Sequence, residues 1–242
     1  MDRRPIFDEK MLAIDNQSTI TLGMGRTSDA DQRLKTAALD LMWEESYGAV
    51  TIDDICKRAD VKKGSFYYFF KSKAELAVAA LEKLWADEWK PRLDQQFSPS
   101  IEPLDRLTGY LEGLYARQAE HLKKYGKVLG CPVWSVGSEI STQEIDVNAK
   151  VREILSRKWR YYESAIRDAI AAGLMEAGDP TKKAQTLGFL IEGAMSQARI
   201  MNNAEPLRNL PASALEMLRA KTSSFAKATV DRTATAGAGQ RY

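Results

Sequence analysis

The chain has 242 residues, which suits one main domain with a smaller one beside it. Hydrophobic residues make up 44% of the sequence and charged residues 28%, so a sizeable core can form and wholesale disorder is excluded. The net charge is only +2, from 35 Lys and Arg against 33 Asp and Glu, which excludes a protein held to nucleic acid by bulk charge. Any nucleic-acid site must therefore be local.

Two cysteines, Cys56 and Cys131, allow at most one disulfide, and no apolar run is long enough to span a bilayer. The first ten residues lack the apolar stretch of a secretory signal. We therefore expect a cytoplasmic protein in a reducing compartment, without contact to a membrane. His121 is the single histidine, which excludes a His-rich zinc site and most Ser/His/Asp triads. The sequence predicts no metal and no cofactor.

Apolar residues recur every three or four positions between two predicted flexible tails, 1–25 and 226–242, and alternating runs are absent. This periodicity predicts an all-α fold. Met24 is an alternative start to Met1, because the regular pattern begins directly after it. Nine helices are expected, at 29–47, 51–59, 63–69, 72–96, 103–124, 128–139, 143–173, 180–203 and 211–225. Capping-box spacing opens two of them, at Thr51 with Asp54 and at Ser72 with Glu75.

The second and third predicted helices are short and follow each other closely, and the first helix is expected to pack on both. This is the arrangement of helix-turn-helix DNA-binding domains. One acid, Asp60, stands in the same stretch as six basic residues: Lys57, Arg58, Lys62, Lys63, Lys71 and Lys73. Such a cluster is the electrostatic footprint of a DNA site, although a solvated charged face has the same composition.

The third helix combines small, hydroxyl-bearing and aromatic side chains. Gly64 leaves its start without bulk, so the backbone can approach a groove. Hydroxyl groups for phosphates and base edges come from Ser65, Tyr67 and Tyr68. Three further aromatic residues are expected to face the core, namely Phe66, Phe69 and Phe70.

The run from Thr51 to Leu76 closely resembles the DNA-binding signature of the tetracycline-repressor (TetR) family of one-component transcription regulators. It reads TIDDICKRADVKKGSFYYFFKSKAEL. The resemblance extends from Arg33 to Leu84, and the rest of the chain agrees in size and helix count. Asp60 departs from the family, in which many members carry glycine in this turn. Because Asp tolerates the left-handed conformation, the departure puts little in doubt.

The resemblance implies a helix-turn-helix domain at 26–75 and a ligand-binding and dimerisation domain at 76–225. It also implies a homodimer that binds a palindromic operator and that a small molecule releases, and it implies that the protein is not an enzyme. Phosphate contacts are expected from Thr51, Tyr68 and Lys73, and Arg26 is expected to reach the minor groove. The residues expected at the major groove are Lys63, Gly64, Ser65 and Tyr67, with Lys62 of the basic cluster beside them.

Family members dimerise through their last two long helices, which here are about 181–203 and 211–225. Small residues allow helices to approach closely, and apolar ones pack across. The expected dimer residues are Leu187, Ile191, Ala194, Ala198, Leu215 and Leu218. An intramolecular core would use the same residues equally well.

The segment beginning Gly130-Cys131-Pro132 resembles the Gly-Cys start of a helix in a TetR subgroup, where the cysteine lies beside the effector pocket and in some members senses electrophiles. A thiol in a first helical turn meets unpaired amides that lower its pKa. Two alternatives stay open, a buried apolar cysteine and one that lines the pocket without reacting. Further pocket candidates are Trp134, Trp159, Tyr162, Glu192 and Met195, of which Trp159 and Tyr162 also suit a core.

Two rival functions remain. In the first, the protein is a constitutive dimeric DNA-binding protein whose larger domain senses no ligand. In the second, it is an enzyme with Cys131 as nucleophile and His121 as base, which is disfavoured because nothing visible orients His121.

Overall fold

A computed structural model describes residues 27–140 and 142–221. Arg26 and both predicted tails lie outside the described residues. Within them the chain is helical, and its only β-pairing is an isolated antiparallel bridge between Met175 and Ala220. The all-α fold is therefore confirmed.

The helical elements follow the nine predicted helices in order, with α4, η2 and α5 together forming the fourth. Their bounds are α1 (Thr27–Glu44), α2 (Ile52–Ala59), α3 (Lys63–Phe69), α4 (Lys73–Lys83), η2 (Leu84–Trp89), α5 (Lys90–Gln96), α6 (Pro103–Tyr125), α7 (Pro132–Ile140), α8 (Ile145–Ala171), α9 (Pro180–Ile200), η3 (Glu205–Leu207) and α10 (Leu210–Leu218). The element η2 is a π-helical turn and η3 is a 3-10 turn.

Two predicted boundaries are wrong because tertiary contacts take up backbone groups. Helix α7 begins at Pro132 rather than 128, since Gln118 accepts the N–H groups of Leu129 and Gly130 and Gly130 has a φ of +73°. Helix α10 ends at Leu218, where the next residue, Arg219, takes a left-handed conformation with φ +57°. The predicted last turn beyond residue 221 lies outside the described residues.

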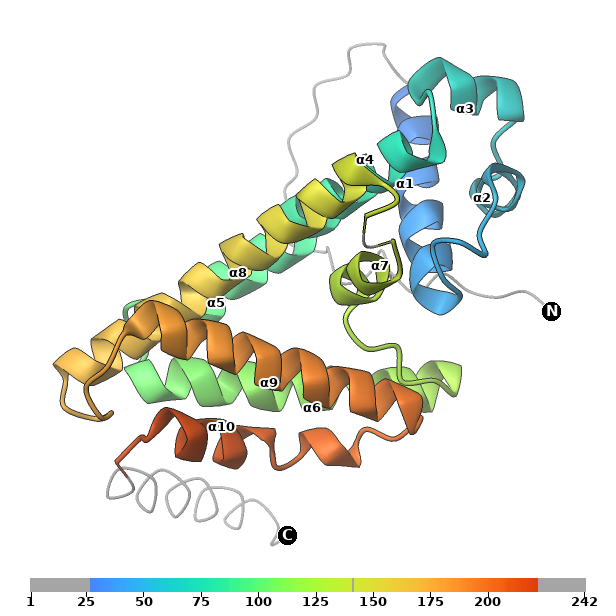
Figure 1. The fold of residues 1–242 in the computed structure, drawn as a ribbon. Coiled ribbons are helices and arrows are strands. Elements are labelled where there is room, and N and C mark those ends of the chain that lie inside the picture. The colour runs from blue at the N-terminus through green and yellow to red at the C-terminus, as the bar shows by residue number, and fades with distance from the viewer. Residues whose placement is uncertain (1–26, 141, 222–242) are drawn as a thin grey trace, which may run out of the picture. The chain divides into compact units, whose positions relative to one another are not determined.

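The contacts divide the chain into two compact units. The described part of the first comprises residues 27–92, 131–140 and 142–156. Here α1 packs against α2, α3, α4 and α7, as Figure 1 lets the reader follow. The fully buried side chains at its centre include Leu34, Ala38, Ile55, Phe66 and Leu76. The interior of this unit therefore positions the two short helices.

The second unit comprises residues 93–130 and 157–221 of the described chain. Helix α10 packs against both α6 and α9 in it (Figure 1). The hydroxyl of Tyr162 on α8 donates to that of Tyr110 on α6 at 2.9 Å, both side chains being buried. The units group residues by packing, so the first unit contains α7 as well as the helix-turn-helix elements. They therefore do not test the predicted functional boundary at residue 76, which stays a prediction.

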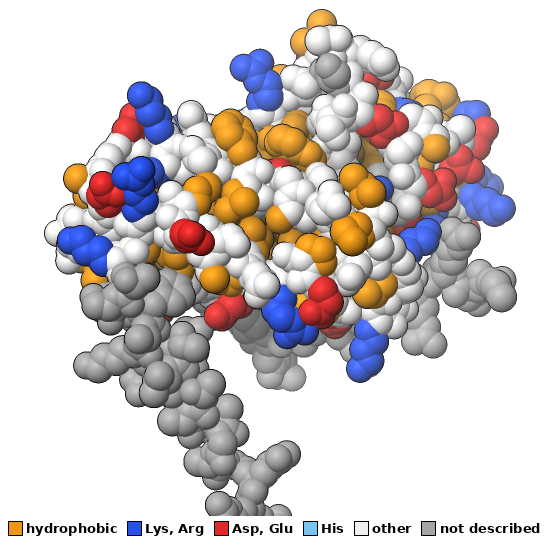
Figure 2. Space-filling view, turned by 60° about the horizontal axis from the view of Figure 1, so that its bottom comes forward, with side chains coloured by type: hydrophobic (Ala, Val, Ile, Leu, Met, Phe, Trp, Pro, Cys, Tyr) orange, Lys and Arg blue, Asp and Glu red, His pale blue; other side chains and the backbone are white. Residues whose placement is uncertain are grey.

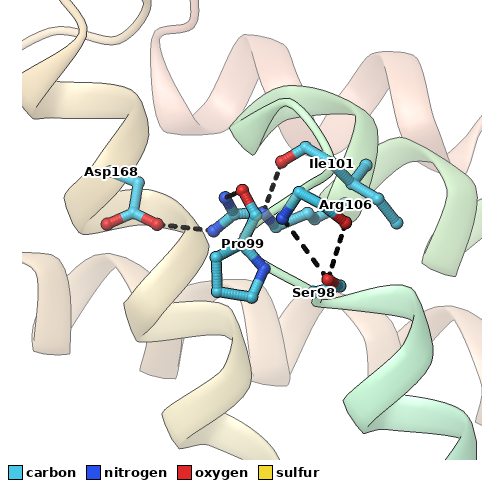
Figure 3. Close-up of polar contacts among 6 residues, drawn as sticks. Ser98, Pro99, Ile101, Arg106 and Asp168 are labelled. Atoms are coloured by element: carbon cyan, nitrogen blue, oxygen red, sulfur yellow. Dashed lines mark hydrogen bonds and ion pairs between the residues drawn. The ribbon is translucent and has the colours of Figure 1, made fainter.

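A buried guanidinium fixes the connection between α5 and α6. Arg106 is 4% exposed, and its Nε donates to the carbonyl of Ile101 at 2.7 Å. Its two other nitrogens reach the carbonyl of Pro99 at 3.1 Å and the carboxylate of Asp168 at 2.5 Å (Figure 3). Because the charge is both paired and hydrogen-bonded, its burial is tolerated and the loop is held against α8.

Candidate functional site

Helix α2 starts with the predicted capping box. The Asp54 N–H donates to Thr51 Oγ1 at 3.2 Å, and the Thr51 N–H donates to Asp54 Oδ2 at 3.0 Å. The Thr51 hydroxyl also donates to Asp54, and these hydrogen bonds lower the pKa of the Asp54 carboxyl. A phosphate would therefore compete with Asp54 for the Thr51 hydroxyl, and the predicted phosphate contact stays a prediction.

The turn between α2 and α3 contains the predicted left-handed residue. Asp60 has φ +51° and ψ +51°, and the Val61 N–H closes the turn on the carbonyl of Cys56 at 3.0 Å. From α1, Arg33 donates to the carbonyls of Ala59 and Asp60 at 2.9 and 3.1 Å. A residue of α1, outside the helix-turn-helix segment itself, thus helps to fix the conformation of this turn.

Helix α3 presents its two tyrosines to solvent. Tyr67 is 54% and Tyr68 75% exposed, whereas Phe66 is completely buried. Phe70 is buried and Phe69 half-buried, so the expected division of the aromatic residues holds for two of the three phenylalanines and partly for Phe69.

The start of α3 is open. A Cβ placed on Gly64 would meet no described atom within 4 Å, so another molecule can approach this backbone. Ser65 is half-buried, and Lys62 is exposed. Together with the two tyrosines they form the exposed face of the helix-turn-helix, which we call the α3 face: Lys62, Lys63, Gly64, Ser65, Tyr67 and Tyr68.

Two of the lysines predicted to contact DNA, Lys63 and Lys73, already have partners within the protein. Lys63 Nζ lies 2.8 Å from Asp53 Oδ1, and this hydrogen-bonded pair raises the pKa of the Lys63 ammonium. Lys73 donates to the carbonyls of Tyr47 and Val50 at 2.8 and 2.9 Å and lies 4.3 Å from the centre of the Tyr47 ring. Two of its three N–H groups are thus used inside the protein. Lys73 therefore stabilises the connection between α1 and α2, in addition to any contact that it makes with DNA.

Cys131 caps α7. It is 8% exposed, and its sulfur accepts the N–H of Trp134 at 3.4 Å. Trp134 itself is half-buried. Burial fits the apolar and the pocket-lining alternatives, and the position at the start of the helix fits the sensing one.

The other four pocket candidates lie in the second unit. Tyr162 is fully buried in the aromatic core, and Met195 is 5% exposed. Glu192 is 1% exposed, and one of its oxygens pairs with Lys158 Nζ at 2.5 Å. Within the described residues, Glu192 Oε2 and Trp159 Nε1 are buried without a hydrogen-bond partner. The pocket stays a prediction, and the structure favours the core alternative for Tyr162.

Sequence reasoning missed three charged residues. Lys158, 3% exposed, was hidden in an amphipathic pattern. Glu88 lies in the π-helical turn, and burial raises its pKa to about 7 although Arg92 opposes the shift. Glu139, at the end of α7, accepts the N–H groups of Tyr47 and Gly48. The flanking tryptophans of Glu88 were the only available signal, because the other partners are distant in sequence.

The residues predicted for dimerisation are mostly interior to this chain. Five are at most 3% exposed, and only Ala194 is half-buried: Leu187, Ile191, Ala198, Leu215 and Leu218 form the interior set. The alternative of an intramolecular core therefore describes these five. Any dimer surface on α9 and α10 must use other faces of the same helices.

Comparison with known proteins identifies the chain. Residues 35–80 match the family described as bacterial regulatory proteins, tetR family, and residues 103–213 match the tetracyclin repressor-like C-terminal domain. The transcriptional regulator AcuR of Cereibacter sphaeroides is 34% identical over 191 residues, 77% of this chain and 84% of AcuR. The chain belongs to the tetracycline-repressor family.

Other TetR relatives agree. The HTH-type transcriptional repressor NemR of Escherichia coli is 26% identical over 186 residues, 75% of this chain and 89% of NemR. A crystal structure of NemR in its reduced form has 25% identity and a TM-score of 0.69, covering 80% of this chain and 98% of that one. A regulatory protein TetR from Rhodobacter sphaeroides has 30% identity and the same TM-score, with coverage of 78% and 98%.

Membership of the TetR family confirms the prediction that the protein is a regulator with a helix-turn-helix domain and not an enzyme. The more specific resemblance to a Gly-Cys subgroup stays a prediction. No helix in the described part of the chain is long and apolar enough to cross a membrane.

Proposed function

We propose that this protein is a homodimeric, one-component repressor that binds a palindromic operator and is released from it by a small-molecule or electrophilic effector. The exposure of Tyr67 and Tyr68 on a short helix beside basic residues is the observation that carries the proposal. Two adjacent aromatic side chains that are exposed to solvent forgo the free energy of hydrophobic burial. Part of this free energy is gained when the helix enters a DNA groove. NemR is named as a repressor, which supports this direction of regulation.

The α3 face supplies the chemistry for DNA. The tyrosine hydroxyls and the lysine ammonium groups reach phosphates, and Gly64 allows close approach to base edges. Lys63 would exchange Asp53 for a phosphate on binding. Arg26, in the arm before α1, is proposed to enter the minor groove, although it lies outside the described residues.

The outer face of α9 is proposed as the dimer surface. Phe189, Ile200 and Met201 are 59%, 79% and 55% exposed, and Gly193 between them is exposed. Figure 2 looks onto the second unit from the side of α10, and hydrophobic side chains gather there among scattered charges. Large exposed apolar side chains on one helix are typical of an interface.

Cys131 is proposed as the contact with an electrophilic effector. Its sulfur caps α7, so a covalent adduct would disturb the first turn of this helix. The NemR structure is described as a reduced form, so this relative has been characterised by redox state. A non-covalent effector would instead use the buried polar atoms of Trp159 and Glu192.

Fluorescence anisotropy on a duplex from upstream of the protein's own gene tests the proposal. Lys62→Ala should weaken binding to all sequences and lower the salt slope by about one. Lys127→Ala, which removes an exposed lysine from the second unit, is the matched control. Unchanged binding in Lys62→Ala would contradict the proposed docking of the α3 face.

The effector response is measured in the same assay with N-ethylmaleimide. Operator release that is lost in Cys131→Ala supports thiol sensing. Binding that ignores the reagent and a panel of small ligands would favour the alternative, a constitutive dimeric DNA-binding protein.

A further inference from the structure

Helix α7 holds the connection between α1 and α2 through a single carboxylate. Glu139 Oε2 accepts the N–H of Tyr47 at 2.8 Å, and Glu139 Oε1 accepts the N–H of Gly48 at 2.7 Å. Both are charge-assisted hydrogen bonds, which are stronger than bonds between neutral groups. One side chain therefore ties α7 to the segment that leads directly into α2.

The same connection is held from two further sides. The hydroxyl of Tyr47 donates to Glu144 at 3.2 Å, and Lys73 at the start of α4 donates to the Tyr47 carbonyl. Tyr47 is 5% exposed, so the segment has little freedom to adjust on its own. If α7 is displaced, either the connection between α1 and α2 moves with it or the two hydrogen bonds to Glu139 break.

Helix α7 in turn packs closely against α8. A Cβ on Gly137 would lie 2.6 Å from Val151 Cγ1, so even one added methyl group requires a shift. The Cys131 cap stands at one end of α7 and Glu139 in the last turn before the other end. Eight residues of rise separate them, about 12 Å at 1.5 Å per residue.

We propose that Glu139 is the positioning residue through which α7 controls the helix-turn-helix. Displacement of α7 moves the Tyr47 and Gly48 amides with it and so changes the placement of α2 and α3 on DNA. This inference rests on the proposed function, because it names the link between the effector domain and the operator. It needs no particular effector, since any event that moves α7 would use the same link.

A double-mutant cycle tests the link without an effector. Gly137→Ala displaces α7 and should weaken binding to the upstream duplex by roughly tenfold. In a Glu139→Gln background the same substitution should change affinity less than about twofold. The glutamine has one acceptor oxygen instead of two, so one amide loses its partner while the exposed side chain leaves the fold intact.

Two controls keep the cycle specific. Glu144→Gln retains an acceptor oxygen for the Tyr47 hydroxyl and should leave the effect of Gly137→Ala unchanged. Val151→Ala removes the methyl groups that the new Cβ meets and should cancel that effect, which shows that it arises from the position of α7. Independent, multiplicative effects of Gly137→Ala and Glu139→Gln would overturn the proposal.

Hydrogen exchange separates this inference from the proposed function. In the full-length protein without DNA, Gly137→Ala should speed exchange of the Tyr47 and Gly48 amides at least roughly tenfold and leave α6 and α9 unchanged. If exchange responds but the wild-type protein binds no DNA at any salt, the proposed function fails and the link stands. If exchange does not respond, the link is wrong even though DNA is bound.

Discussion

Lys73 shows, at the scale of single residues, how one side chain serves both fold and function. Its position at the start of α4 is the one that family resemblance assigns to a phosphate contact. The structure adds two bonds to the carbonyls of Tyr47 and Val50, 26 and 23 residues away in sequence. Any loss of DNA binding on substitution therefore contains a contribution from a loosened α1–α2 connection.

Lys73→Ala should lower the free energy of unfolding by about 1–3 kcal/mol, because two buried carbonyl bonds to a charged donor are lost. Urea denaturation measures this change. Lys71→Ala, at an exposed neighbouring position, should leave stability within about 0.5 kcal/mol of wild type. A Lys73→Ala protein as stable as wild type would show that the two bonds contribute nothing net.

The turn between α2 and α3 holds the backbone of Asp60 in an unfavourable left-handed conformation. With φ at +51° it occupies the left-handed region, which costs most L-residues about 1–2 kcal/mol and costs Asp less, because its short side chain tolerates this conformation. Its fully exposed carboxylate makes only a 4.0 Å ion pair with Arg33, which offsets little of that cost.

Asp60→Gly should therefore raise the free energy of unfolding by about 0.5–1 kcal/mol. Thermal unfolding at fixed protein concentration checks this, with Asp60→Asn as a control that should change stability little, since Asn also tolerates this conformation. A glycine variant less stable than wild type would mean that the entropy of the unfolded chain outweighs the strain.

The π-helical turn η2 is an element that periodicity did not predict. It lies between α4 and α5 and carries Trp85, Glu88 and Trp89. A π turn widens the helix locally and changes which side chains face inward, and such turns are frequent at functional sites. The same turn carries two buried tryptophans and an ionisable group, and burial raises the pKa of Glu88 to about 7.

Glu88 should make stability depend on pH. Because its folded pKa lies above the usual 4.5, the folded state binds the proton more tightly, and the stability present below pH 4.5 is lost as pH rises through 7. Glu88→Gln should therefore match wild type near pH 4 and exceed it near pH 8 by up to about 3 kcal/mol. Urea titrations at the two pH values measure the difference.

Asp87→Asn, at the exposed neighbouring position, is the control and should show no gain at pH 8. Equal stability of Glu88→Gln and wild type at pH 8 would show that water reaches the carboxylate.

At the scale of the whole molecule, the proposed palindromic operator would require two chains to associate. Two recognition helices must be held one turn of DNA apart, which a single chain cannot do. The candidate surface is the exposed face of α9, whereas the helix's buried face, with Leu187, Ile191 and Ala198, forms the core of the second unit.

Gly193→Arg should convert the protein to a monomer and lower operator affinity by at least roughly 100-fold, because an interface core does not accept an unpaired charge. No described atom lies within 4 Å of a Cβ at this position, so the fold should survive. Light scattering and circular dichroism check the two statements. Glu112→Arg, an exposed charge reversal on α6, is the control. A dimeric Gly193→Arg protein would place the interface elsewhere.

The sequence by itself determined the fold class, the order of the helices and the character of the α3 face. These follow from local rules: apolar spacing, the capping residues Thr51 and Ser72, and a turn residue that tolerates positive φ. The exposure of Tyr67 and Tyr68 could be predicted for the same reason, since a two-turn helix must leave one side outside.

Only the tertiary structure decided which partners those residues have. The bonds of Lys73, the ion pair of buried Lys158 with Glu192, and the bond of Glu139 to Tyr47 join positions 23 to 92 residues apart. Periodicity says that a face is buried but not against what, which is why five predicted dimer residues are core. Distance in sequence carries no information about such pairings, because packing of whole helices sets them.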